Sequence, residues 1–166
     1  MLRCHIAIIF SLALEIAGCA SSPHRPLEAR VTEYGLYTRG TESIHNDSTV
    51  PSGQTRGSYG YQLRQTTREV PLAVGASFGF CYEVAGLEPG STPKVSVDAV
   101  HPSFARPGQP PVGQHSFPRK LVARDGVIRD CTGYGFDHQF ELVPGTWRFS
   151  VVVNGAPVLT QEFTAR

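Results

Sequence analysis

The segment Gly75–Gly79 matches the pattern G-x-S-x-G, in which Ser77 would be the nucleophile of an α/β-hydrolase. In that fold the serine occupies a strained turn between a strand and a helix. Here the following residues, Phe80–Val84, continue as an alternating strand, and the chain lacks the βαβ units of a hydrolase. We therefore expect the two glycines to serve a turn and a strand. A small hydrolase using Ser77 with His101 or His138 is retained as the alternative hypothesis.

The histidines and acidic residues form no metal-ligand or acid–base pattern. The histidines lack H-x-H and i, i+4 spacing, so we expect loop side chains that face solvent. The aspartates stand near turns, where short carboxylates cap backbone amides. We expect no catalytic residue, no metal site and no cofactor. The residues considered are His24, His45, His101, His115 and His138, with Asp125, Asp130 and Asp137.

The N-terminal residues have the composition of an export signal. Arg3 precedes an apolar run from Ile6 to Ala17, interrupted by Glu15. This run is too short to span a bilayer of about 30 Å, but it suits a cleaved signal peptide. The segment 16–19, which ends in Cys19, resembles the bacterial lipobox, whose cysteine receives a diacylglyceryl thioether before cleavage. An ordinary secretory peptide, with Cys19 incidental, is the other interpretation.

Two cysteines remain once Cys4 is assigned to the signal peptide and Cys19 to the lipid. In an oxidising compartment we expect Cys81 and Cys131 to form a disulfide. Cys81 alternates with aromatic residues on its strand, so the bond would lie on the outer face or near an edge and join the segment 130–135, expected to be a loop, to the sheet. Two free thiols or a metal site are the alternatives, and the absence of a nearby histidine disfavours a metal.

Composition favours a single all-β domain of short strands. The 166 residues include 17 Gly and 13 Pro, and this high content of helix-breaking residues disfavours long helices. The net charge of +1 gives no electrostatic reason to expect a nucleic-acid partner.

Alternating apolar residues predict a two-sheet sandwich of seven or eight mostly antiparallel strands. Trp147 and the alternate residues after it share one face, and Asn154-Gly155 is a strong signal for a type I′ hairpin turn. Asp125-Gly126 predicts another turn. We expect strands at 30–37, 59–69, 78–84, 95–99, 120–123 and 147–153, a final strand through Leu159 and Phe163, and exposed loops at 38–57 and 102–118.

Several motifs resemble a bacterial family of small exported proteins that is catalogued as a domain of unknown function. The resemblance extends over roughly residues 30–165. It implies an immunoglobulin-like β architecture, and it brings no activity, ligand or catalytic residue. Its motifs are Thr132–Asp137, Glu141–Trp147, Asn154-Gly155 and Gln161–Thr164, with weaker ones at Glu33–Tyr37 and Gly75–Phe80.

These observations predict a signal peptide over residues 1–18, a lipid-anchored tether over 19–28 and a β-sandwich over 29–166. We expect a lipoprotein of the bacterial envelope, anchored through Cys19 and placed in the outer membrane by the usual sorting rule. The domain would be a non-catalytic binding or structural module, with an envelope protein or a glycan as candidate partner; the small envelope hydrolase is the alternative. The two long loops are the expected contact surfaces. Tyr34, Tyr37, Tyr59 and Tyr61 form either an aromatic surface for such a partner or ordinary strand positions.

Overall fold

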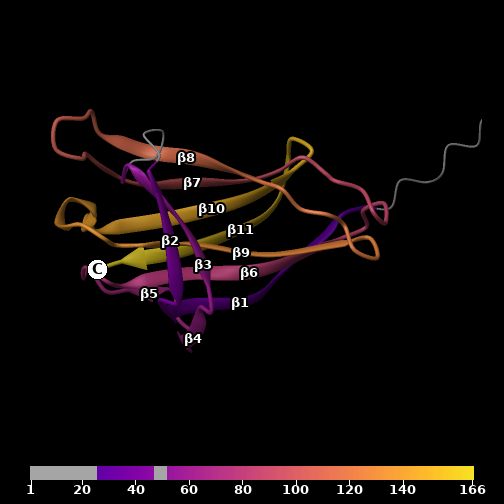
Figure 1. Ribbon diagram of the computed structural model, residues 1–166, viewed down its shortest axis with the longest axis horizontal. Coiled ribbons are helices and arrows are strands. Elements are labelled where there is room, and N and C mark those ends of the chain that lie inside the picture. Colours follow the sequence, from indigo (N-terminus) through magenta and orange to yellow (C-terminus); the bar gives the residue numbers. More distant parts are fainter. Residues whose placement is uncertain (1–25, 47–51) are drawn as a thin grey trace, which may run out of the picture.

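The computed structural model describes residues 26–46 and 52–166. Two sheets face each other and enclose one core, as the alternation of apolar residues predicted (Figure 1). The predicted signal peptide, Cys19 and His24 lie outside the described residues. Within the described part, no helix is long and apolar enough to cross a bilayer. The predicted all-β class and two-sheet sandwich are confirmed.

The first sheet has four strands in the order β4-β1-β6-β9, each antiparallel to its neighbours. The second has five strands in the order β5-β11-β10-β7-β8, with only the β5–β11 pair parallel. The strands of the first sheet are β1 (Glu28–Thr38), β4 (Gln62–Gln65), β6 (Ser77–Ala85) and β9 (Val127–Gly135). Those of the second sheet are β5 (Glu69–Val70), β7 (Val95–Phe104), β8 (Val112–Arg119), β10 (Gly145–Val153) and β11 (Ala156–Ala165).

A separate two-stranded hairpin, β2 (Thr41–Asn46) and β3 (Gln54–Tyr59), belongs to neither sheet. Figure 1 shows it crossing in front of the sandwich at a steep angle to the other strands. The expectation of a loop over 38–57 was wrong, because the hairpin carries polar residues on both faces. The described side chains of β2 are exposed, so no buried face imposes an apolar alternation.

The core is built from the inward side chains of both sheets. Trp147 and Phe149 of β10 are 0% exposed, and Phe78 and Phe80 of β6 are 1% exposed. The Phe78 ring meets that of Trp147 edge-on, with 5.5 Å between centroids. Aromatic side chains bury large apolar areas and favour such tilted contacts. The strand pattern of β6 and β10 therefore fixes the packing between the sheets.

The two tight turns expected at Asp125-Gly126 and Asn154-Gly155 are present. Asn154 and Gly155 have φ of 52° and 85°, as a type I′ turn requires. They join β10 to β11 in an antiparallel pair that extends from Val153–Ala156 to Gly145–Ala165.

Several expected boundaries were wrong. Residues 112–119 are the edge strand β8, which accommodates Pro118 because an edge strand has one unpaired side. Residues 120–123 are irregular, and 130–135 belong to strand β9. The expected strand 59–69 is divided between the end of β3, β4 and the first residue of β5.

The sandwich has two ends with different contents. One end, where β1 begins, is called the tether end because the predicted tether leads into β1. There β1 begins beside the turns that follow β6, β8 and β10, and Leu87 N donates to Gly126 O at 3.1 Å. At the far end lie the connection from β1 to β2, the 105–111 loop and the 136–144 segment, as Figure 1 shows on the left. The chain therefore enters the domain at the end opposite these segments.

Candidate functional site

The far end gathers polar side chains from three separate segments. Its centre is Glu141, which ends the short 3-10 helix η1 (Gln139–Glu141) and is 0% exposed. Its carboxylate accepts hydrogen bonds from the Tyr134 hydroxyl and the His138 amide, both at 2.8 Å, and from the Asp137 amide. A buried carboxylate is stable only with such donors. Glu141 thus shapes the 136–141 segment from inside.

Arg39 fastens the end of β1 to the same segment. Its Nη1 lies 2.6 Å from the Asp137 carboxylate, and its Nη2 donates to Phe136 O at 3.0 Å. The guanidinium lies over Gly135, where an added Cβ would come within 2.9 Å of Nη2. These bonds hold the start of the connection from β1 to the hairpin against the 136–141 segment.

The two segments expected to be contact loops meet at this end. Gly53 is buried, and an added Cβ there would come within 1.9 Å of Arg106 Nη1 in the 105–111 loop. A side chain at position 53 would have to displace the guanidinium. The residues that begin β3 and the loop between β7 and β8 thus form one continuous surface.

Burial and the adjacent Glu141 carboxylate raise the pKa of Tyr134 well above its usual value. Tyr134 stays protonated at neutral pH and remains a hydrogen-bond donor. Tyr134, Asp137 and Glu141 are therefore held together by hydrogen bonds to one another and to Arg39.

Ser77 is 6% exposed and begins β6, which continues without a helix. Among the described residues, no hydrogen bond joins it to His101 or His138. His101 directs Nδ1 to Pro102 O at 2.9 Å and stacks on Trp147 with 4.5 Å between centroids. His138 stacks on Phe140 at 5.0 Å. The arrangement does not bring nucleophile and base together as covalent catalysis requires.

His101 and His115 form a pair of imidazoles on β7 and β8, with ring centroids 5.4 Å apart. Burial lowers the pKa of both, and that of His115 falls to about 4. The Nε2 atom of each is buried without a hydrogen-bond partner. The expectation of solvent-facing histidines was therefore wrong for this pair. It holds for His45, which is exposed on β2.

The other residues that could bind metal do not converge. Within residues 26–46 and 52–166, no group of three or more His, Cys, Asp or Glu side chains is arranged to hold an ion.

Cys81 and Cys131 are joined in a disulfide on the outer face of the first sheet. They occupy directly opposed positions on β6 and β9, with 4.0 Å between Cα atoms. Gly79 and Gly133, two residues away, are opposed in the same way. A Cβ at Gly79 would lie 2.3 Å from Thr132 O, so only glycine fits where the strands approach this closely.

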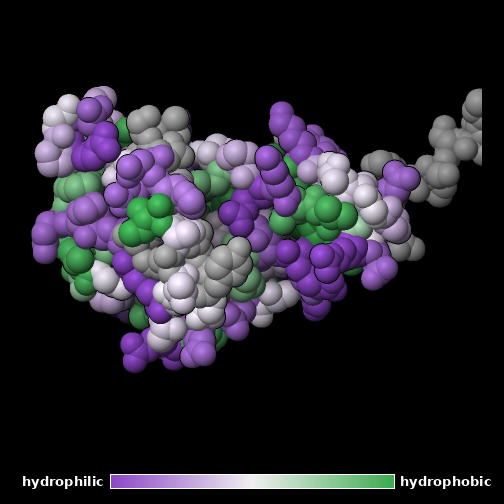
Figure 2. All heavy atoms as spheres, in the orientation of Figure 1, coloured by the Kyte–Doolittle hydropathy of each residue, from purple (hydrophilic) through white to green (hydrophobic). Residues whose placement is uncertain are grey.

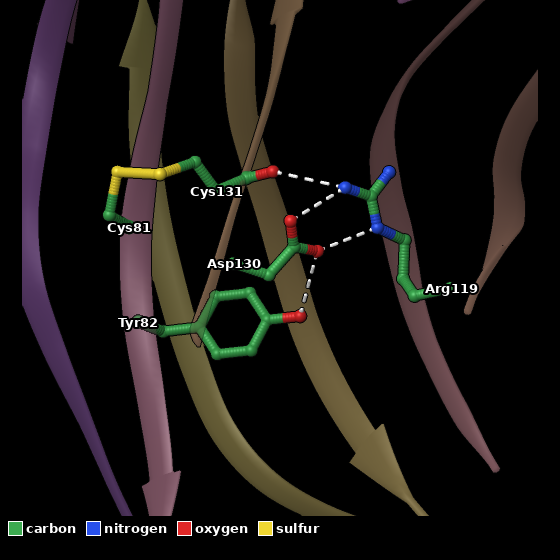
Figure 3. The surroundings of a disulfide bond; sticks show 5 residues. All are labelled: Cys81, Tyr82, Arg119, Asp130 and Cys131. Atoms are coloured by element: carbon green, nitrogen blue, oxygen red, sulfur yellow. Dashed lines mark hydrogen bonds and ion pairs between the residues drawn. A yellow bond between two sulfur atoms is a disulfide. The ribbon is translucent and has the colours of Figure 1, made fainter. Parts of the chain in front are cut away.

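The opposite side of the same strand pair carries an ion pair (Figure 3). Arg119 of β8 donates to both carboxylate oxygens of Asp130 on β9, at 2.7 and 2.8 Å. Arg119 also donates to Cys131 O at 3.3 Å, and the Tyr82 hydroxyl donates to Asp130 at 3.3 Å. The contacts join the edge strands of the two sheets.

Of Tyr34, Tyr37 and Tyr61, whose side chains are described, Tyr37 and Tyr61 form a pair. Tyr37 and Tyr61 meet edge-on at 6.2 Å, and Tyr61 is 42% exposed. Tyr34 packs against the core, and the Arg68 guanidinium lies 5.0 Å from its ring. The side chain of Tyr59 lies outside the described residues. Tyr61 is thus the one of these four with a well exposed ring among those described.

Three important residues escaped the sequence analysis: Arg39, Arg119 and Glu141. Each makes its contact with a segment distant in sequence or through backbone amides, for which spacing gives no signal. For Glu141, the position inside a resembling motif was the only available indication.

The model of a family described as "Domain of unknown function (DUF3859)" matches residues 25–165. The chain belongs to this family. No curated protein matches this chain.

Among solved structures, an immunoglobulin-like protein from Pseudomonas aeruginosa is similar, with a TM-score of 0.59 and 24% identity over 87% of this chain and 100% of that chain. At this identity the similarity shows the fold alone. The alkylpurine DNA glycosylase AlkC of Pseudomonas fluorescens, bound to DNA with an abasic site analog, has a TM-score of 0.40 and 20% identity over 61% of this chain and 28% of that chain. That likeness is too low to support an argument.

Proposed function

We propose that the protein is a lipid-anchored lipoprotein of the bacterial envelope whose DUF3859 domain is a non-catalytic binding or structural module. The observation that carries the proposal is the Cys81–Cys131 disulfide. Disulfides persist in exported proteins and are rare in the reducing cytosol. The bond therefore supports export, which the N-terminal segment also predicts, and leaves Cys19 for a thioether.

The contacts of the candidate catalytic groups support a non-catalytic role. Glu141 is engaged by backbone amides and a tyrosine, and His101 stacks in the core. These contacts give Glu141 and His101 a role in stabilising the fold, so no catalytic role is needed to explain them. We take Ser77 as a strand residue because it begins β6, which continues without a helix, and a Ser77→Ala variant should keep its fold and its phenotype.

We further propose that the far end contacts an envelope protein or a glycan. A tether attached beside the start of β1 would leave the opposite end free to reach away from the bilayer. Loops held on a rigid sandwich commonly carry recognition. The contact of Gly53 with Arg106 combines two of these segments into one surface.

Palmitate labelling in cells tests the anchor. The wild type should incorporate label and float with membranes, and Cys19→Ser should lose both. Export without label would refute the anchor. A photo-reactive amino acid at Gln109, exposed in the far-end loop, tests the contact against one at Val100, exposed on the outer sheet face. Equal adducts at both positions, or none at Gln109, would refute the far-end surface.

A further inference from the structure

The tether end carries an exposed apolar residue between two cationic ones. Val122 is 54% exposed, and Lys120 and Arg124 on either side are also exposed. In the described part of the chain, neither cation has a hydrogen-bonded or ionic side-chain partner. An apolar side chain flanked by Lys and Arg is suited to the interface of an anionic bilayer, where apolar groups enter and cations meet phosphates.

The backbone holds this segment in a fixed shape. Ala123 is 0% exposed, its amide donates to Ser91 O at 2.9 Å, and its carbonyl accepts from Gly90 N at 2.7 Å. Because the middle of the segment is pinned inward, Val122 and Arg124 are turned outward. Presenting them to a surface requires no reordering of the loop.

The same end is where a tether would hold the domain. Pro26 O lies 2.6 Å from the position of a Cβ on Gly86, and Leu87 bonds to Gly126 in the turn just after Arg124. The chain from Cys19 to Pro26 is seven residues long and reaches about 25 Å when fully extended. A lipid at Cys19 would thus keep residues 120–124 within a short distance of the bilayer, at a high effective concentration.

We infer that residues 120–124 dock on the surface of an anionic phospholipid bilayer and orient the anchored domain with its far end outward. The inference rests on the proposed lipid anchor. Glu88 and Asp125 are exposed at the same end and oppose the attraction to anionic lipid, which should weaken as the salt concentration rises.

A matched pair of probes tests the docking. Val122 and Val74 are similarly exposed, at 54% and 48%. Val74 lies at the far end, because the amide of the following residue, Gly75, donates to Phe136 O. Val122→Cys and Val74→Cys in the lipidated full chain would each carry a polarity-sensitive fluorophore. The protein is reconstituted into phosphatidylglycerol–phosphatidylcholine vesicles containing a headgroup nitroxide lipid, and flotation is measured in parallel.

We expect quenching at Val122 at least threefold stronger than at Val74. Adding Lys120→Gln and Arg124→Gln, or raising the salt to about 0.5 M, should reduce this quenching by half or more. Floating protein with equal quenching at both probes would overturn the docking and leave the anchor intact. If the quenching at Val122 is the same with and without the two charge changes, Lys120 and Arg124 do not contribute to docking, and that part of the inference is overturned. Protein that does not float would overturn both the anchor and the docking.

Discussion

Arg119 and Asp130 join the edge strands of the two sheets, with two hydrogen bonds of 2.7 and 2.8 Å between guanidinium and carboxylate. The Asp130 side chain is 15% exposed and the Arg119 side chain 34%. A planar guanidinium that faces both carboxylate oxygens is favourable because its donors match the acceptor geometry. This contact closes the side of the sandwich where β8 and β9 would otherwise separate.

Asp130→Asn should lower the free energy of unfolding by about 1–3 kcal/mol, because it weakens charge-assisted bonds to a partly buried guanidinium. Urea denaturation of Asp130→Asn, Arg119→Gln and the double variant measures the coupling. Arg148 and Glu162 form an exposed pair, with 57% and 49% of their side chains accessible, and serve as the control. A coupling at Arg119–Asp130 no larger than at this control would contradict the prediction.

Reducing the Cys81–Cys131 disulfide should destabilise the domain without unfolding it. The bond closes a loop of 50 positions, for which chain entropy gives about 4 kcal/mol. The strands are also held by nine consecutive paired positions from Ser77–Gly135 to Ala85–Val127. Circular dichroism of Cys81→Ser/Cys131→Ser should match that of the oxidised protein, with a lower urea midpoint. A variant that is unfolded in buffer would show that the paired strands are insufficient.

Gly79→Ala should cost about 3 kcal/mol, because the added Cβ would overlap Thr132 O and separate β6 from β9. Gly113→Ala on β8 is the control, since its Cβ would lie 3.2 Å from His101 O and a small shift relieves the contact. Thermal or urea unfolding measures the difference. Similar losses at both positions would mean that the close approach at Gly79 is unimportant.

Glu141→Ala should lower the free energy of unfolding by about 2–4 kcal/mol, because two partly buried amides and the Tyr134 hydroxyl would lose their acceptor. Glu162→Ala, at an exposed site, should cost under about 1 kcal/mol. Hydrogen exchange at the Asp137 and His138 amides provides a local measure. Unchanged protection there would contradict the assigned role.

Burial of His115, which lies beside His101, should make the stability of the domain sensitive to acid. The pKa of His115 is lowered from 6.5 to about 4 in the folded protein, mainly by burial. The unfolded chain therefore takes up the proton first, and stability falls as the pH drops from about 6.5 to about 4. The loss reaches at most about 3 kcal/mol. His115→Gln should flatten this part of the profile, as urea midpoints between pH 7 and pH 4 can show. Parallel profiles would refute the role of His115.

The sequence predicted most reliably those elements in which one face is buried. Alternation in β6 and β10 revealed the core strands and predicted that Cys81 lies on the outer face or near an edge, since successive residues of a strand point to opposite faces. The hairpin β2–β3 and edge strand β8 gave no such signal. The hairpin has polar residues on both faces, and Pro118 interrupts the alternation in β8. The contacts of Arg39 with Asp137 and of Arg119 with Asp130 depend on which strands are neighbours in space. Their positions along the chain do not contain that information.

The hairpin β2–β3 shares no ladder with either sheet. Arg39, just before β2, contacts Asp137, and Gly53, just before β3, lies against Arg106 of the 105–111 loop. The length and composition of the hairpin can consequently change without disturbing the buried strands. Differences in sequence and length among related chains should therefore concentrate in the β2–β3 hairpin. The same stable sandwich could then acquire new binding specificities with little effect on folding.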